Sequence, residues 1–185
     1  MKNNLRKRLL CGLFFCVFTL VGNAQKVAYK SNLLYLGTTT LNAEWEIGLT
    51  PKTTMSVLGA YNPWTFRDDK MMHLWAVQPE YKYWFCERFE GHFVGVHAHG
   101  AQFFGDFWGL NKDHRYDGYL VGAGASWGYD WILSPHWNLE LELGFGVNRV
   151  WYKESDRLPC VKCTEKKTKT FFSPTKVALS LVYGL

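Results

Sequence analysis

The segment from Trp137 to Asn148 alternates strictly between two kinds of side chain. Large apolar residues hold every odd position, whereas the even positions hold only glutamate, glycine and asparagine, including Glu140 and Glu142. A period of two is the signature of a β-strand, because successive side chains of a strand point to opposite faces. The segment therefore predicts a strand with one apolar face and one face of charged or small side chains.

The same alternation recurs at 41–49, 119–133 and 177–185. The chain is also rich in aromatic residues (17%) and contains 17 glycines, which suits strands and turns better than helices. Extending the pattern along the chain gives eight expected strands, at 26–36, 40–49, 53–62, 73–85, 92–104, 118–132, 137–151 and 172–185. Short and long connections alternate between them, with the long ones at 64–72, 105–117 and 152–171.

Two eight-stranded architectures fit this pattern, and they assign the faces oppositely. A soluble lipocalin-like barrel keeps its large apolar residues inside, whereas a membrane barrel turns them outward against lipid. The interior of eight strands is just wide enough to be filled by side chains, so Trp45, Trp127, Trp131 and Trp137 together would overfill it. The size argument favours the membrane barrel.

The reverse assignment places the charged side chains in the lumen. Glycine and serine on the inner face would make room there, and basic side chains could pair with the acidic ones. Six residues are predicted to form this lumen charge network: Glu44, Glu46, Lys82, Glu140, Glu142 and Arg149. A charge facing lipid at the bilayer midplane would cost about 2–4 kcal/mol, so the absence of acidic side chains from the apolar faces of these strands supports this orientation.

Strand length and tryptophan placement agree with a membrane barrel. A membrane strand needs about 9–11 residues, and the clearest strands here reach that length. Tryptophans near strand ends are interpreted as interfacial girdles: Trp64, Trp84, Trp131, Trp137 and Trp151. The expected fold is therefore all-β, a single eight-stranded antiparallel up-and-down barrel of the outer-membrane type.

The first 24 residues resemble a cleaved signal peptide. Lys2, Arg6, Lys7 and Arg8 precede an apolar run that ends at the small-residue site Gly22-Asn23-Ala24. The run is shorter than the ~20 residues that span a bilayer, which argues against an anchor helix. We expect a signal peptide at 1–24 and one barrel domain at 25–185. Without the leader the net charge falls from +5 to +1, and no basic run interleaved with aromatics remains to suggest nucleic-acid binding.

Four segments give the chain a family resemblance: "KSNLLYLGTTTLNAEWEIGL", "GAYNPWTF", "QPEYKYWFCERFEGHFVG" and "GAGASWGYDWILSPHWNLELELGFG". They are similar to the family catalogued as domain of unknown function 3575, found largely in Bacteroidetes and grouped with outer-membrane β-barrels. The resemblance covers nearly the whole chain after the leader. It implies an outer-membrane barrel and carries no established activity or catalytic residue.

Three cysteines follow the expected leader. Cys160 and Cys163 stand in the last long connection, where a small disulfide in an oxidising compartment is the favoured interpretation. A redox motif would need a βαβ context, and a structural zinc site usually takes four ligands, so those alternatives are weaker but stay open. Cys86 is expected in a turn, as a free thiol or in an intermolecular bridge.

Other reactive residues favour binding or structure over catalysis. His97 and His99 share a strand face, a spacing that metals use, although hydrogen bonding of neutral rings inside a packed lumen is the commoner outcome. A lipid-modifying enzyme needs a serine activated by a histidine at the rim, and Ser126 and Ser180 fall on the expected inner face instead. We therefore expect no enzyme, cofactor or metal.

The sequence thus predicts a structural or binding protein of the bacterial outer membrane that uses its outer loops as contact surface. Its expected partners are outer-membrane lipid and another envelope protein, with no nucleic acid. A wide pore is not expected from eight strands. The alternatives are a lipid-modifying barrel enzyme that transfers or hydrolyses acyl chains and a soluble lipocalin-like binding barrel.

Overall fold

The computed structural model describes residues 27–66, 70–105, 114–156 and 165–184. Its elements are β1 (Val27–Asn32), α2 (Leu33–Gly37), β2 (Leu41–Thr50), β3 (Thr53–Asn62), β4 (Thr65–Phe66), β5 (Lys70–Trp84), β6 (Gly91–Gly105), β7 (His114–Ser134), β8 (Trp137–Asp156) and β9 (Glu165–Gly184). Among the described residues, no helix is both long and apolar enough to cross a membrane. The expected signal peptide and the pair Cys160 and Cys163 lie outside the described residues.

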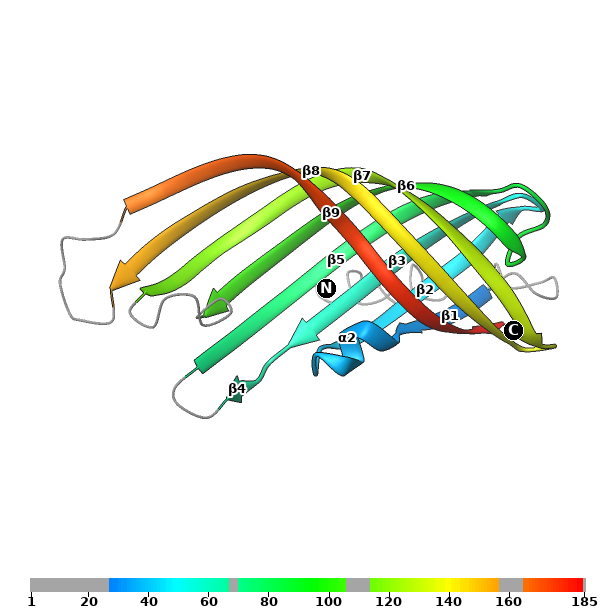
Figure 1. The fold of residues 1–185 in the computed structure, drawn as a ribbon, viewed down its shortest axis with the longest axis horizontal. Coiled ribbons are helices and arrows are strands. Elements are labelled where there is room, and N and C mark those ends of the chain that lie inside the picture. The colour runs from blue at the N-terminus through cyan, green and yellow to red at the C-terminus, as the bar shows by residue number, and fades with distance from the viewer. Residues whose placement is uncertain (1–26, 67–69, 106–113, 157–164, 185) are drawn as a thin grey trace, which may run out of the picture.

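Eight of the strands form one closed antiparallel wall, shown in Figure 1. Each strand pairs with its neighbour in the chain, β3 pairs with β5, and β1 pairs with β9 to close the circle. The two-residue strand β4 pairs only with β5 and stands outside this count. The eight-stranded antiparallel barrel expected from the sequence is confirmed.

The two ends of the barrel differ in their connections. At one end lie the short connections β2–β3, β5–β6 and β7–β8, together with the start of β1 and the end of β9; we call it the short-turn end. At the other lie α2 and the connections β3–β5, β6–β7 and β8–β9; we call it the long-loop end. Figure 1 shows the short-turn end on the right. Strand pairing between β7 and β8 continues to His114 opposite Asp156, so part of the expected long loops at 105–117 and 152–171 is strand.

The first expected strand, at 26–36, is wrong beyond Asn32, because the chain turns into helix α2 there. The Asn32 side chain caps this helix by accepting a hydrogen bond from the Leu34 N–H at 3.0 Å. The apolar residues that follow, beginning with Leu33, resemble a strand in sequence but are too few to show a helical period. As a result β1 pairs with β9 only as far as Asn32 opposite Ser180.

Two asparagine side chains satisfy the backbone where β1 leaves the wall. On one side, the Asn32 amide donates to the Val177 carbonyl at 3.2 Å and its oxygen accepts from the Leu179 N–H at 3.3 Å. On the other side, Asn42 accepts from the Asn32 N–H at 2.6 Å and donates to the Asn32 carbonyl at 3.0 Å. Their hydrogen bonds replace the strand-to-strand hydrogen bonds that are lost there, because buried backbone groups need partners. We call the interruption of the wall between β9 and α2 the seam.

Inner and outer faces of the wall are those expected. Outward side chains are large and exposed, such as Trp127 at 48% and Val147 at 52%, whereas Glu46 and Lys82 point inward and are 0% exposed. One tryptophan departs from the expected girdle. Trp84 shares the inward parity of Lys82, is fully buried, and donates a hydrogen bond to the Thr54 hydroxyl at 3.0 Å.

The other four expected girdle tryptophans lie at the surface. Trp64, Trp131 and Trp137 are exposed, and Trp151 is half-buried. Trp84 instead packs against Phe93 inside the short-turn end, with ring centroids 4.7 Å apart. The prediction for Trp84 was wrong because it rested on position near a strand end and ignored the parity of the strand.

A bulge in β9 changes which residues face the lumen. Gly144 of β8 pairs with Lys176, and the next residue, Phe145, pairs with Pro174, so Thr175 is an extra residue in β9. Lys176 is buried, and Thr175 also reaches inward, where its hydroxyl lies 2.8 Å from His97 Nε2. The inward parity of β9 is therefore odd before the bulge and even after it.

Candidate functional site

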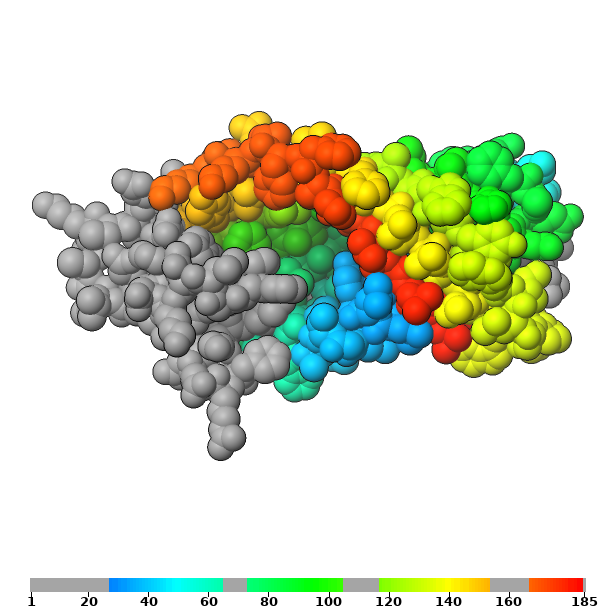
Figure 2. Space-filling model, in the orientation of Figure 1, coloured from blue at the N-terminus to red at the C-terminus, as the bar shows by residue number. Residues whose placement is uncertain are grey.

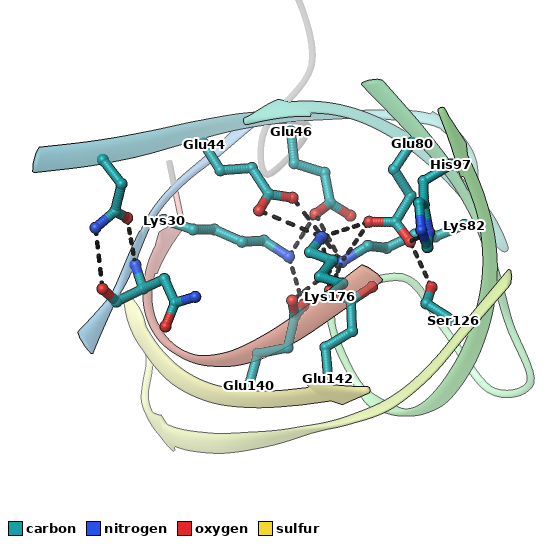
Figure 3. Close-up of polar contacts among 12 residues, drawn as sticks. Lys30, Glu44, Glu46, Glu80, Lys82, His97, Ser126, Glu140, Glu142 and Lys176 are labelled. Carbon is teal, nitrogen blue, oxygen red and sulfur yellow. Dashed lines mark hydrogen bonds and ion pairs between the residues drawn. The ribbon is translucent and has the colours of Figure 1, made fainter. Parts of the chain in front are cut away.

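The lumen is crossed by a cluster of eight buried charged side chains, which we call the charged network (Figure 3). Its members are Lys30 of β1, Glu44 and Glu46 of β2, Glu80 and Lys82 of β5, Glu140 and Glu142 of β8, and Lys176 of β9. All eight residues are 0–4% exposed. Each faces the lumen because the alternation of its strand places it there.

Lys82 is the centre of the charged network. Its ammonium lies 3.0 Å from both Glu140 and Glu142. The other three carboxylates, of Glu44, Glu46 and Glu80, lie 3.8–4.0 Å away, so Lys82 approaches all five. The Lys82 ammonium also lies over the face of the Phe93 ring, 4.3 Å from the ring centroid. A single cation thus holds together carboxylates from three strands.

The other two lysines join the remaining strands to this centre. Lys30 forms ion pairs with Glu46 and Glu140. Lys176 pairs with Glu80 and with Glu142, the latter at 2.9 Å, and lies 3.6 Å from Glu44. Buried ions are costly to desolvate, and only several close partners of opposite charge compensate that cost. The network therefore acts as a cross-link between β1, β2, β5, β8 and β9.

Glu80 connects the network to the two strands beside it. It accepts a hydrogen bond from the Ser126 hydroxyl of β7, and His97 Nδ1 of β6 lies 3.7 Å from its carboxylate. Ser126 therefore faces a carboxylate and not a histidine. A serine nucleophile needs a base that accepts its proton directly, and the fully buried Glu80, already paired with Lys176, is poorly suited to that role.

The charged network divides the interior into two cavities. Along β8, Asn138 lines a cavity of about 460 Å³ at the short-turn end, Glu140 and Glu142 belong to the network, and Asn148 lines a cavity of about 400 Å³ in the long-loop half. The same order holds on β9 with Val182, Lys176 and Ser173. The buried ion pairs thus lie between the two spaces.

Five of the six residues expected in the lumen lie together in the network: Glu44, Glu46, Lys82, Glu140 and Glu142. The prediction that Arg149 joins the lumen network was wrong. Arg149 is exposed on the outer face, with its guanidinium 5.1 Å from the Trp151 ring centroid. In β8 the even-numbered residues face the lumen, so an odd position could not join the network.

Sequence reasoning missed Lys30, Glu80 and Lys176. Strand parity was the signal that could have found them. Lys30 shares a face with Ala28 and Asn32, Glu80 precedes Lys82 by two positions, and Lys176 precedes Ala178 by two. Glu80 therefore shares the face already given to Lys82, and the small or polar neighbours of Lys30 and Lys176 mark the inner face of their strands.

The two histidines of β6 have hydrogen-bond partners in the long-loop half. His97 Nε2 contacts the Thr175 hydroxyl, and His99 Nε2 lies 2.6 Å from the Asn148 side-chain oxygen. Within the described ranges, no group of three or more His, Cys, Asp and Glu side chains is arranged to hold a metal ion. Cys86, in the turn between β5 and β6, is an exposed free thiol.

Comparison with known proteins identifies a family and no activity. The family described as "Protein of unknown function (DUF3575)" matches residues 10–185, which is nearly the whole chain. No curated protein and no solved structure matches the chain.

Proposed function

Because the chain belongs to this family of unknown function, we propose its role from the barrel itself: an outer-membrane protein that serves as a structural or binding element. The observation that carries the proposal is the assignment of faces. The eight side chains of the charged network are buried in the lumen, while the outer wall carries exposed tryptophans, tyrosines and aliphatic residues. Water would favour the opposite arrangement, and hydrocarbon favours this one.

Aromatic side chains on the outer wall support a membrane position. Tyr61, Trp75, Tyr119 and Trp151 follow one another along the strand register on the long-loop side, interrupted only by Gln102. At the short-turn end Trp137 packs against Tyr183 with ring centroids 4.9 Å apart. Two aromatic belts that border an apolar band are typical of barrels whose ends meet lipid headgroups.

We propose a binding role in preference to conduction. The ion pairs of the charged network lie across the lumen and leave separate cavities on either side. The contact surface we propose is the long-loop end, where β7, β8 and β9 extend beyond the aromatic row and expose Lys153 and Lys167. The proposed partners are outer-membrane lipid and another envelope protein.

Cell fractionation tests the membrane proposal. We expect the protein in the outer-membrane fraction, extracted only by detergent, with the unboiled sample migrating faster on a gel than the boiled one. A spin label at Val147→Cys, in a background without other cysteines, should collide with oxygen and not with a water-soluble nickel chelate. Lys153→Cys is the matched control on the same strand and should contact the chelate. Recovery in the soluble fraction without detergent would refute the proposal.

We propose no catalytic role, because Ser126 lacks a histidine partner and lies inside the wall. The test compares the masses of lipid A and phospholipids from wild-type and deletion strains. We expect identical acyl-chain patterns. A mass difference of one acyl chain, restored by the wild-type gene, would instead establish the lipid-modifying alternative.

A further inference from the structure

We propose that the cavity in the long-loop half binds one long-chain fatty acid, which enters sideways from the membrane through the seam. This inference rests on the proposed function, since it requires lipid against the outer wall. Four features carry it: the cavity walls, two buried polar groups without partners, the interruption of the wall, and the closed floor.

The walls of the cavity are mostly apolar. Its volume is about 400 Å³, within the range of about 300–1,000 Å³ typical of small-molecule sites. Inward side chains of three strands, Leu58, Leu74 and Leu120, line it together with Phe171 and Pro174 of β9. Such a lining suits an alkyl chain and offers little to a sugar or a nucleotide.

A donor without a partner lies in the same cavity. Gln78 is 5% exposed, and its side-chain Nε2 has no hydrogen-bond partner. An amide nitrogen can only donate, and a buried donor left unpaired costs about 1–3 kcal/mol. The cavity therefore favours a ligand that brings an oxygen acceptor to Gln78.

An acceptor without a partner lies beside this donor. The Asn148 amide donates to the Ser173 hydroxyl at 2.9 Å, so its oxygen faces His99 and the His99 Nε2 carries the proton. In the neutral ring the other nitrogen, Nδ1, is then an acceptor, and it has no partner.

Strand register brings the two groups together. Val77 pairs with Gly100 and Glu80 with His97, so Gln78 lies opposite His99 on the adjacent strand. Directly opposed residues have Cβ atoms about 5 Å apart. A neutral carboxyl group fits this pair, because its carbonyl oxygen accepts from Gln78 and its hydroxyl donates to His99.

The seam gives this site a route to the outer wall. Pro174 lines the cavity and is also exposed on the outer face of β9, opposite Phe145, so the cavity reaches the outer surface beside this strand. Figure 2 shows the molecule hollowed between β9 and α2, with deeper strands visible through the opening. The hydrogen bonds of Asn32 and Asn42 satisfy the backbone at the edge of the seam where β1 ends and α2 begins. They make the interruption a stable part of the fold.

The floor of the cavity is closed. On β5, Glu80 follows the cavity residue Gln78 by two positions, and on β9, Lys176 directly follows Thr175. Glu80 and Lys176 are both buried. A fatty acid that enters through the seam therefore cannot pass the charged network. The site is suited to holding a fatty acid rather than passing it to the short-turn end.

The test uses delipidated full-length protein in lipid nanodiscs and palmitic acid labelled with ¹³C at the carboxyl carbon. We expect one carboxyl signal distinct from that of palmitate in empty nanodiscs, and a stoichiometry of one per barrel. Gln78→Leu should weaken binding about tenfold, because it removes the donor and keeps the apolar volume. Hexadecane, which lacks the carboxyl group, should not displace palmitate at equal concentration.

A matched pair of substitutions locates the site. Ala76→Phe fills the cavity and should abolish the distinct signal, whereas Ala98→Phe adds the same ring on the outer face of β6 and should leave it unchanged. Each sample is first checked for faster gel migration before boiling. A folded membrane barrel without the signal, or with the signal intact in Ala76→Phe, overturns this inference alone. Failure to find a membrane barrel overturns the proposed function as well.

Discussion

The lumen is filled differently in the two halves of the barrel, and strand β6 shows the contrast. At Gly95 of β6, in the half nearer the short turns, an added Cβ would lie 2.5 Å from Glu80 and 2.6 Å from Ser126. His99, four residues along the same strand and on the same inner face, instead lines the cavity of about 400 Å³. The lumen around the charged network is packed and cross-linked by charge, whereas the long-loop half has a cavity lined mostly by apolar side chains and an interrupted wall. The proposed binding site thus lies apart from the groups that cross-link the strands.

The largest expected effect comes from removing the centre of the charged network. Lys82→Met leaves five buried carboxylates with two lysines, and breaking a buried pair costs about 3–5 kcal/mol. We expect the free energy of unfolding to fall by that amount in urea titrations in lipid vesicles. Lys153→Met, an exposed lysine of β8, is the control and should change it by less than about 0.5 kcal/mol. Equal effects of the two substitutions would contradict a cross-linking role.

Packing of the lumen around the charged network can be tested on β6. Gly95→Ala should lower the free energy of unfolding by about 2 kcal/mol, because the new methyl group displaces Glu80 and Ser126 from a filled lumen. Gly100→Ala, on the outer face of the same strand, is the control and should be neutral or stabilising by up to about 1 kcal/mol, since the position has room and glycine loses more entropy on folding. The same urea titration measures both. If Gly95→Ala proves as harmless as Gly100→Ala, the lumen beside Glu80 is not as tightly packed as we infer.

A smaller effect is expected at the seam. Asn32→Ala removes the cap of α2 and two hydrogen bonds to β9, which should cost about 1 kcal/mol. Hydrogen exchange should accelerate at the Leu34 and Leu179 amides, which lose their acceptor. Asn138→Ala, near the short turns, is the control and should leave both rates unchanged. Unaltered exchange at Leu179 in Asn32→Ala would show that this side chain does not support the edge of β9.

Alternation in the sequence predicted the barrel and the direction of its faces because one rule governs every strand. Glu140 and Glu142 stand among leucines, so both the strand and its charged face follow from spacing alone. Arg149 and Trp84 were misplaced where that rule was set aside in favour of charge or of position near a strand end. Applied consistently, it would have put Arg149 outside and Trp84 inside.

Other features depend on contacts that no local pattern carries. β1 leaves the wall at Asn32 because of hydrogen bonds to Val177 and Asn42. Val177 is 145 positions away in the sequence, and Asn42 belongs to β2. The pairing of Lys30 with Glu140 joins residues 110 positions apart and requires the closed wall. The unpaired groups of Gln78 and His99 become a site only when the register places them side by side.

The extra residue at Thr175 also determines how the barrel can be assembled. In a strand without a bulge, every second residue faces the same side along its whole length. Because the inward parity of β9 changes at Thr175, pairing with β8 without the bulge would turn one of its two parts inside out. The bulge therefore has to form when β9 pairs with β8, so that the two parts of the last strand both face the lumen correctly and Lys176 reaches its glutamates.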